Sequence, residues 1–254
     1  MNNVASVSEA FRQATSVGGV ASRFWGVVQA YDGYAQFGSG HGATLVLTAH
    51  AVIELSAMAR SRGDMEESMR VVDLSEAPGE RATWGRSRFQ VYLWAIVELL
   101  IVTNPLQISS RVRTAVLRAF GAQIGRQVIF RPRTRVKFPW KLRVGDRSWI
   151  GEGVWIHNQD FVDIGDDVVI SQESFITTGS HSHRIDMALI TSPVMVADGT
   201  WVTARCMILG GTSIGKSSLV TPMSLVKGRH EENAILSGNP AIRTGDRFRL
   251  SGTN

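Results

Sequence analysis

Five polar side chains that could take part in catalysis or ligand binding gather in two short stretches of the chain. The first stretch holds His157, Asn158 and Asp160, and the second holds His181 and His183. Histidine has an ordinary pKa close to neutrality, so it can accept a proton from a hydroxyl group at physiological pH. Three histidines can also hold a zinc ion, and Asp160 could orient an imidazole. Each of these residues could instead be a surface residue without a chemical role. The elements that position them decide between the two interpretations.

A six-residue apolar repeat occupies most of the chain from Ile124 to Val226. Large apolar residues fall six apart in five triples: Ile124, Phe130, Val136; Val144, Ile150, Ile156; Ile164, Ile170, Ile176; Val196, Val202, Ile208; Ile214, Val220, Val226. Strands alternate with period two, so this interval predicts a short strand followed by a corner. Three such units close a triangular coil, and stacked coils bury a continuous apolar axis. The sequence therefore predicts a mainly β protein, a parallel β-helix of about five coils.

Two further residue classes follow the same interval. Small residues four positions after the large ones complete the inward set: Val128, Thr134, Ser148, Val154, Val168, Ser174, Ser180, Thr200, Cys206, Thr212, Ser218 and Ser224. Glycine recurs one position after the large residue, at Gly125, Gly145, Gly151, Gly165 and Gly215. Glycine is favoured where the backbone turns without a Cβ clash, so we expect these positions at corners.

The repeat is interrupted three times, and every interruption follows the third side of a coil. The steps from Val136 to Val144 and from Ile156 to Ile164 are two residues too long, and the step from Ile176 to Val196 is fourteen too long. Coils stack about 4.8 Å apart, so the three insertions should be neighbours on one edge. That edge gathers Pro139 and Trp140 with both histidine-bearing stretches. Loops on a rigid scaffold commonly carry functional sites.

The charge of the chain is strongly basic, with a formal net charge of +5 and a pI near 9.9. Between Arg111 and Arg147 lie nine arginines and two lysines against one acid, Asp146. This surface could be a solvated face, or it could meet an anionic membrane or an anionic ligand such as a coenzyme phosphate. A nucleic-acid partner is not expected, since no recognised nucleic-acid module accompanies the basic residues.

Compartment signals point to the cytoplasm, with peripheral membrane association as an open alternative. The single cysteine, Cys206, allows no disulfide framework, which is typical of a reducing compartment. The N-terminus lacks the basic start and apolar core of a signal peptide. The longest apolar run, Val91 to Thr103, is too short to span a bilayer and contains Glu98, so it should pack on the β-helix or lie in a membrane interface.

Outside the repeat, the chain divides into three further parts. Residues 1–70 form an extension of uncertain structure, with His41 and His50 in no recognisable motif, around a potential helix at 45–61, and the native start could be Met65 or Met69. Residues 71–123 form a helical segment, with one helix over 89–102 and a second that Ser109 or Ser110 caps. Its apolar stripe is Val112, Val116, Leu117 and Phe120. The β-helix domain covers 124–231, and 232–254 form a cap and tail.

Several stretches match the wording of a known family. They are RAFGAQIG, FPWKLRVGD, IGEGVWIHN, VDIGDDVVISQESFITTGSHSHR, PVMVADGTWVTARCMILGGTSIG and SGNPA. From about residue 71 to the end, the chain resembles the hexapeptide-repeat O-acetyltransferases of exopolysaccharide synthesis, in particular the colanic acid acetyltransferase branch. The maltose and galactoside acetyltransferases are more distantly similar. The resemblance implies a left-handed β-helix and a homotrimer with sites between subunits. It also implies transfer of acetyl from acetyl-CoA to a hydroxyl of a saccharide or lipid-linked saccharide, without a metal.

The resemblance also implies roles for individual residues. The family's catalytic histidine matches His181, although Ser182 follows it where the colanic acid branch commonly has aspartate. The acceptor site would include Asn158, with Asp160 and His183 as further candidates. Donor-binding positions are Trp201, Ala204, Thr221, Ser224 and Lys227, and the backbone N–H of Ala204 would face the thioester oxygen.

The residues themselves favour direct transfer. A hydroxyl group is a poor nucleophile at neutral pH, and His181 can serve as its general base. An acyl-enzyme would need an activated cysteine or serine, whereas Cys206 occupies an inward position and should be buried and inert. Two alternatives stay open at this point. One is a carbonic anhydrase-like β-helix enzyme with zinc on His157, His181 and His183, and the other is a non-catalytic trimeric scaffold.

Overall fold

The computed structural model describes residues 29–31, 34–38, 44–48, 54 and 71–249, and it divides the chain into two units, Met1–Val71 and Val72–Asn254. In the first unit, β1 (Gln29–Tyr31), β2 (Tyr34–Gly38) and β3 (Thr44–Thr48) form an antiparallel sheet in the order β1-β2-β3. The helix predicted over 45–61 is therefore wrong at its start, because residues 45–48 pair with β2. His41, His50 and most of that segment lie outside the described residues.

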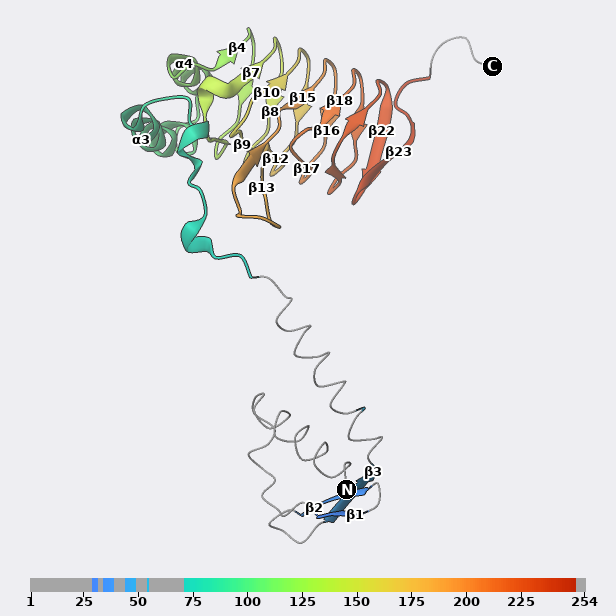
Figure 1. Ribbon diagram of the computed structural model, residues 1–254. Helices are drawn as coiled ribbons and strands as arrows, with labels where there is room; N and C mark the ends of the chain where they lie inside the picture. The colour runs from blue at the N-terminus through green and yellow to red at the C-terminus, as the bar shows by residue number, and fades with distance from the viewer. Residues whose placement is uncertain (1–28, 32–33, 39–43, 49–53, 55–70, 250–254) are drawn as a thin grey trace. The chain divides into compact units, whose positions relative to one another are not determined.

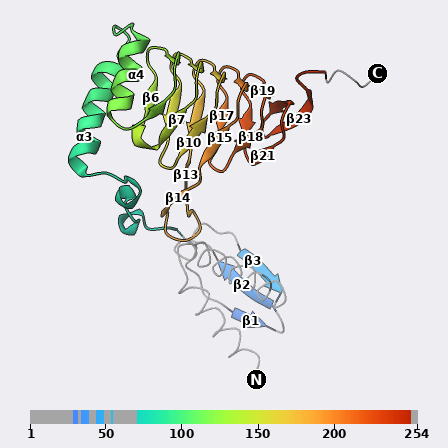
Figure 2. The ribbon, with the colours of Figure 1, turned by 90° about the horizontal axis from the view of Figure 1, so that it is seen from above.

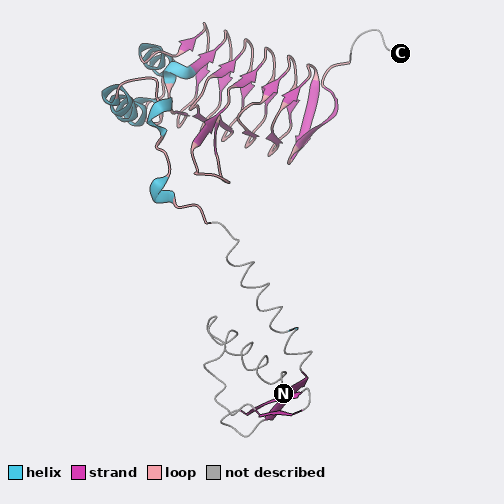
Figure 3. Ribbon diagram, viewed as in Figure 1, coloured by secondary structure: helices cyan, strands magenta, loops and turns pink. Residues whose placement is uncertain are grey.

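The second unit is a parallel β-solenoid whose short strands stack into three sheets (Figures 1 and 3). The first sheet contains β4 (Gln123–Ile124), β7 (Leu142–Val144), β10 (Val162–Ile164), β15 (Val194–Val196), β18 (Ser213–Ile214) and β21 (Arg229–His230). The second contains β5 (Ile129–Phe130), β8 (Trp149–Ile150), β11 (Val169–Ile170), β16 (Trp201–Val202), β19 (Leu219–Val220), β22 (Ala234–Gly238) and β23 (Ala241–Asp246). The third contains β6 (Arg135–Val136), β9 (Trp155–His157), β12 (Phe175–Thr177), β17 (Met207–Ile208) and β20 (Leu225–Val226).

The solenoid continues beyond the five coils predicted from the repeat. Strand β21 pairs in parallel with β18, and β22 pairs in parallel with β19, so a sixth turn begins after Val226. Its third side is missing because β22 turns back into β23, an antiparallel partner. The repeat did not predict this turn because the apolar residues after Val226 no longer fall six apart. The strands nevertheless stack on those of the preceding coil. The residues predicted as a C-terminal cap therefore begin with β22, which belongs to this sixth turn, and continue with its antiparallel partner β23.

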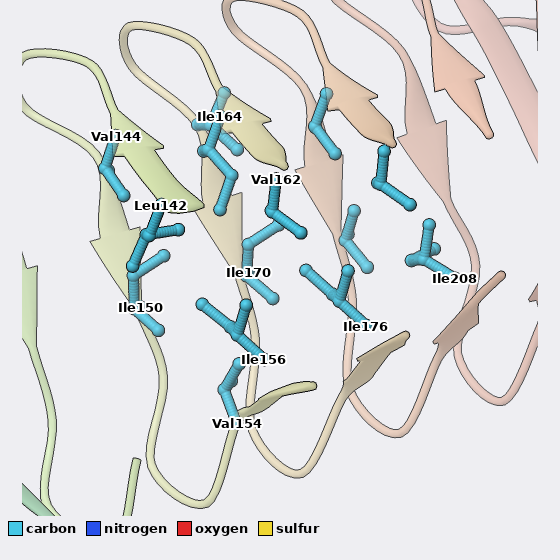
Figure 4. Packing of buried hydrophobic residues seen from close by; sticks show 14 of the residues in the cluster. Leu142, Val144, Ile150, Val154, Ile156, Val162, Ile164, Ile170, Ile176 and Ile208 are labelled. Atoms are coloured by element: carbon cyan, nitrogen blue, oxygen red, sulfur yellow. The ribbon is translucent and has the colours of Figure 1, made fainter. Parts of the chain in front are cut away.

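The core lies along the solenoid axis, where the large repeat residues from successive coils stack (Figure 4). Fourteen of the fifteen predicted inward positions are at most 1% exposed, and Ile124 at the open end is partly buried. The small inward residues are also buried, and their hydroxyls bond to backbone carbonyls, as Ser148 Oγ does to Gly165 O at 2.7 Å. Ser180 is the exception, since it is exposed on an inserted hairpin rather than inward.

Glycine follows the large residue because neighbouring coils approach closely there, not because the backbone has a positive φ. Aspartates of one coil accept a hydrogen bond from the backbone of the coil before it, as Asp166 Oδ1 does from Asp146 N at 2.7 Å. A Cβ built at Gly145 would lie 2.3 Å from that same Asp166 oxygen. Any side chain there would break the aspartate ladder, so glycine is required at this position.

Helices cover the first coil. After the short 3-10 turns η2 (Leu74–Glu76) and η3 (Glu80–Thr83) come α3 (Arg88–Val97), the π-helical segment η4 (Glu98–Val102) and α4 (Ser110–Ala119), which Ser109 caps. Trp94 Nε1 donates to Val136 O at 2.9 Å, and Glu98 Oε1 accepts from Val136 N at 2.6 Å. These groups stand in for the neighbouring strand that β6 lacks on this side. Both predicted helices are confirmed.

One residue in the predicted stripe of the second helix is misplaced. Val112 is 43% exposed, whereas the adjacent Arg113 is fully buried. The guanidinium of Arg113 donates to Val102 O at 3.1 Å and Asn104 O at 3.2 Å, and it also bonds to Gln107 O. The last carbonyls of a helix have no partner within the helix, so a buried arginine that supplies donors is favourable there. Apolar periodicity could not indicate this.

Candidate functional site

The three insertions lie together on one edge of the solenoid, as their common position in the repeat predicted. The first forms the 3-10 turn η5 (Pro139–Lys141), and Lys141 Nζ bonds to Gln159 O in the second. The second meets the third where Asp160 N donates to Thr178 Oγ1 at 2.8 Å. Residues separated by up to forty positions in the sequence therefore form one continuous inserted edge.

The longest insertion is a hairpin that presents His181. Strands β13 (Gly179–His181) and β14 (Leu189–Thr191) pair antiparallel, with His181 opposite Leu189. The hairpin projects from the side of the solenoid (Figure 2). His181 is exposed, and its Nδ1 lies 2.8 Å from Met187 O. A carbonyl can only accept, so Nδ1 carries the proton of the neutral ring and Nε2 keeps its lone pair. In the neutral ring, Nε2 is thus the nitrogen that can accept a proton, which is what a general base requires.

The other histidines of this edge differ from His181 in their surroundings. His183 is exposed, and no side-chain hydrogen bond to it occurs among the described residues. His157 is partly buried between Trp155 and Phe175, with Nδ1 3.4 Å from Thr177 Oγ1. Burial, together with the positive charge of Lys137, lowers the pKa of His157 below its ordinary value. His157 is therefore neutral near pH 7 and lies on the outer face of the third sheet, where its carbonyl oxygen accepts from Thr178 N next to the base of the hairpin.

Asn158 serves the fold. It is fully buried, its Oδ1 accepts from Phe138 N at 3.0 Å, and its Nδ2 donates to Phe138 O at 2.7 Å. Both ends of the amide are occupied in joining the first two insertions, so we do not carry Asn158 into the acceptor site. Asp160 is partly buried at the base of the hairpin, where its Oδ1 accepts from Phe161 N.

A second surface with binding capacity lies on the opposite side of the third sheet, at the corner between the second and third sheets. An open groove of about 450 Å³ follows this corner across three coils. Its lining is Ser171, Gln172, Trp201, Thr203, Ala204, Leu219, Thr221 and Pro222. Three of the predicted donor-binding residues, Trp201, Ala204 and Thr221, therefore share one groove. Trp201 is 43% exposed, and its Nε1 donates to Ser171 Oγ at 2.9 Å.

Ala204 offers a free backbone donor in this groove. It is the second residue of a tight corner whose third residue, Arg205, has a φ of 58°. Arg205 N donates to Gln172 O of the coil below, and Ala204 O accepts from Met223 N of the coil above. The N–H of Ala204 has no acceptor within the described part of the chain. Pro132 and Pro222 occupy the same corner position in other coils, which shows that the fold does not need this N–H.

Two predicted donor-binding residues lie outside the groove. Ser224 is buried, with its hydroxyl 3.0 Å from Thr221 Oγ1 and 3.1 Å from Gly238 N, so it stabilises the last corner. Lys227 is exposed near the end of the solenoid, and its carbonyl oxygen lies 3.0 Å from His230 Nε2. Cys206 is buried as expected, with Sγ 3.2 Å from Thr221 O.

Sequence reasoning missed the contribution of the segment before α3. Glu80 Oε2 accepts from Lys137 Nζ at 3.1 Å and from Gln159 Nε2 at 2.6 Å, and Thr83 O accepts from Lys141 Nζ. The segment before α3 thus stabilises the inserted edge through hydrogen bonds to its first two insertions. No sequence pattern links Glu80 to partners 57 and 79 positions away. The groove residues Ser171 and Gln172, in contrast, were within reach, since they occupy the corner of Thr203 and Ala204 one coil earlier.

Within one chain, the groove and His181 belong to different corners of the prism. Ala204 lies where the second sheet passes into the third, and the hairpin begins where the third sheet ends. The strands of the third sheet separate the two. Among the described residues no cluster of three or more histidine, cysteine, aspartate or glutamate side chains is suited to hold a metal ion.

The chain matches no protein-family model. Over 171 residues, 67% of this chain and 94% of the relative, it is 33% identical to WcaF of Escherichia coli (strain K12), named as an acetyltransferase of colanic acid biosynthesis. It is also 30% identical over 109 residues, 38% of this chain and 56% of the relative, to WbbJ of the same strain, named as an O-acetyl transferase of lipopolysaccharide biosynthesis.

Solved structures share the fold. A hexapeptide-repeat acetyltransferase from Vibrio cholerae O1 biovar eltor, complexed with acetyl coenzyme A, has a TM-score of 0.60 at 22% identity, and the match covers 68% of this chain and 100% of the other. A galactoside acetyltransferase in complex with coenzyme A has a TM-score of 0.56 at 16% identity, over 67% of this chain and 83% of the other. The six-residue repeat, the solenoid and the match to WcaF over 94% of its length together show that the chain belongs to the hexapeptide-repeat acetyltransferases.

Proposed function

We propose that the protein transfers acetyl directly from acetyl-CoA to a saccharide hydroxyl, with His181 as the general base. The supporting observation is the bond from His181 Nδ1 to Met187 O, which makes Nε2 the proton-accepting nitrogen of the neutral, exposed ring. Nε2 takes the hydroxyl proton as the hydroxyl oxygen attacks the thioester carbon. When the tetrahedral intermediate collapses, the C–S bond breaks and the same proton passes to the departing thiolate. No group of the protein is acylated in this sequence.

The donor would lie in the groove along Trp201, Ala204 and Thr221. The Trp201 ring offers an apolar wall, and the free N–H of Ala204 can donate to the oxyanion of the intermediate. Fixed backbone donors of this kind need no rearrangement during the reaction, which is why they stabilise developing charge well. Lys227 is proposed as a contact for a coenzyme phosphate, since it is exposed near the same end of the solenoid.

The active assembly would be a homotrimer with each site between two copies. In one chain the base and the groove occupy different corners, so a second copy that places its hairpin against the groove would complete the site. Light scattering should give a mass three times the 27.8 kDa of one chain. A monomer that retains full turnover would overturn the shared site.

The acceptor would be a saccharide of exopolysaccharide biosynthesis, either free or lipid-linked, with Asp160 and His183 as proposed contacts. The names of WcaF and WbbJ support this class. Release of free coenzyme A from acetyl-CoA should depend on saccharide when hexoses, oligosaccharides and lipid-linked saccharides are compared in a thiol assay. If none of them stimulates release from protein that binds acetyl-CoA, the saccharide assignment is wrong.

A further inference from the structure

The helical segment that covers the first coil carries a stripe of large, exposed apolar side chains, and within the described chain only Tyr92 of the stripe makes a ring contact, edge-on to Trp84. Six residues of α3 and η4 form it, and their exposed fractions lie between 39% and 75%: Phe89, Tyr92, Leu93, Ile96, Leu99 and Leu100. Their spacing of three and four positions places them on one face of the helix. Leu106 and Ile108, in the connection to α4, are 87% and 85% exposed. Exposed apolar surface of this extent on one element usually marks an interaction site.

The opposite face of the same helix packs on the first coil of the solenoid and on α4. Trp94 and Val102 are buried there, and Trp94 and Glu98 bond to the backbone of Val136. The stripe therefore lies on the face of the helix that does not pack on the solenoid, and it points away from the coils. In Figures 1 and 2, α3 lies outermost at this end of the solenoid. The six side chains are thus presented at an end face of the second unit.

The surroundings of the stripe are positively charged. From Trp84 to Gly145 the only acid is Glu98, whose carboxylate is engaged with Val136 N, while the same stretch carries twelve arginines and lysines. Four of the twelve, Arg126, Arg133, Lys137 and Arg143, form ion pairs with acids outside this stretch. Arg86 and Arg88 stand at the start of α3, and Arg111 lies on α4, which contacts η4. These three arginines are exposed and form no ion pair with any described carboxylate.

We propose that this end face, comprising the α3–η4 stripe and its flanking arginines, docks on an anionic lipid bilayer. The fifteen residues of α3 and η4 span roughly 22 Å at 1.5 Å per residue, less than the roughly 30 Å of a hydrocarbon core. No helix within the described residues is long and apolar enough to cross a bilayer. The helix would lie in the membrane plane, with its apolar side among the acyl chains and the arginines at the phosphates.

A second copy fits this face less well than a lipid surface does. A two-fold contact brings the same patch of both copies together. Here it would place the unpaired arginines of one copy near those of the other, with no acid in the patch to balance them. A bilayer that contains anionic lipid supplies both the apolar interior and the negative charge. Docking on lipid is independent of the chemistry at His181 and is measured without turnover.

The test is sedimentation of the full chain with lipid vesicles. Vesicles of phosphatidylcholine alone are compared with vesicles that contain phosphatidylglycerol, at low and at high salt. Binding should require phosphatidylglycerol and should weaken as salt rises, because surface charge is screened. Arg111→Ala should weaken binding to the anionic vesicles about fivefold, which corresponds to about 1 kcal/mol per surface arginine.

Ile96→Glu is the decisive variant, and Ile242→Glu is its matched control. Ile96 is 57% exposed in the stripe, whereas Ile242 is 65% exposed on β23 at the other end of the solenoid. Ile96→Glu should lower vesicle binding at least tenfold at an unchanged melting temperature, and Ile242→Glu should bind as wild type does. Three results would overturn the proposal: equal binding to neutral vesicles, equal binding by both variants, or a loss of oligomer mass in Ile96→Glu without vesicle binding by the wild type.

Discussion

Ile170 and Ile190 are both isoleucines and lie twenty positions apart, yet Ile170 is fully buried in a coil and Ile190 is 50% exposed on the hairpin. In the coils, each position in the repeat fixes the direction of its side chain, since the inner strands pair in register with the strands above and below, as β11 does with β16 and β8. The hairpin pairs only with itself and keeps no such register. The rigid coils therefore set where a groove can form, while the inserted edge frees side chains such as His181 from packing.

The largest expected effect concerns the base on the hairpin. His181→Ala should lower turnover about 10²–10⁴-fold, the usual range for general acid–base catalysis. The melting temperature should not change, because the side chain is exposed. Turnover is measured as saccharide-dependent release of coenzyme A, with Arg184→Ala, an exposed position in the same loop, as the control. Wild-type turnover in His181→Ala would remove the base assignment.

One substitution placed in both regions tests the contrast in packing directly. Ile170→Ala should lower the free energy of unfolding by about 2–5 kcal/mol, because it leaves a cavity in the core. Ile190→Ala should change it by less than about 0.5 kcal/mol, as exposed positions usually do. Urea unfolding of both variants measures the difference. Similar losses in the two would show that the hairpin is part of the cooperative core.

The corner at Ala204 allows the backbone donor to be removed without a change of fold. Ala204→Pro deletes the N–H at a position where two other coils already carry proline, so stability should stay near wild type. Turnover should fall about 10²–10³-fold if this N–H stabilises the oxyanion. Glu152→Pro makes the same change two coils earlier, outside the groove, and should leave turnover intact. Equal turnover in both variants would refute the role of Ala204.

Trp201 and Trp149 provide a pair for testing the groove. Both are exposed on the second sheet at equivalent positions, separated by Val169 of β11, but only Trp201 lines the groove. Trp201→Ala should weaken acetyl-CoA binding about tenfold, or about 1.4 kcal/mol, whereas Trp149→Ala should not affect it. Isothermal titration measures both constants. A larger loss in Trp149→Ala would place the donor elsewhere on this sheet.

The smallest effect is on stability at acid pH. Burial and the neighbouring Lys137 depress the pKa of His157, while Glu80 opposes them and Arg135 adds to the depression. The unfolded chain then binds this proton more readily than the folded protein does. Stability is therefore complete above the ordinary histidine pKa of about 6.5 and is lost as pH falls toward the lower folded pKa. Unfolding curves at pH 7.5 and 5.5 should show a steeper loss in wild type than in His157→Gln, and equal losses would contradict this burial.

The solenoid could be predicted from the sequence because one interval determines both strand and core. Ile156 and Ile176 follow it and are buried, and the same count located the insertions on one edge. The sixth turn could not be predicted, since Arg229–His230 and Ala234–Gly238 pair as strands without the six-residue apolar interval. Pairing there depends on hydrogen bonds from the preceding coil, which composition does not show.

The candidate site was predictable where the coils carry it and less so on the inserted edge. Trp201, Ala204 and Thr221 share a groove because equivalent corners stack. The burial of Asn158 results from a pair of bonds with Phe138, a contact across twenty residues that no local pattern encodes. The bond from His181 to Met187 likewise depends on how the hairpin loop folds back.

We propose that acetyl-CoA binds on the coils and that the general base lies on the hairpin. Thermal stabilisation by acetyl-CoA tests this separation most directly. At 100 times its dissociation constant the ligand should add about 2.7 kcal/mol to the stability of the native state. Wild type and His181→Ala should show the same saturable rise in melting temperature, and Trp201→Ala should need more ligand to reach it. No rise in the wild type with its oligomer intact would contradict the account and favour a non-catalytic scaffold.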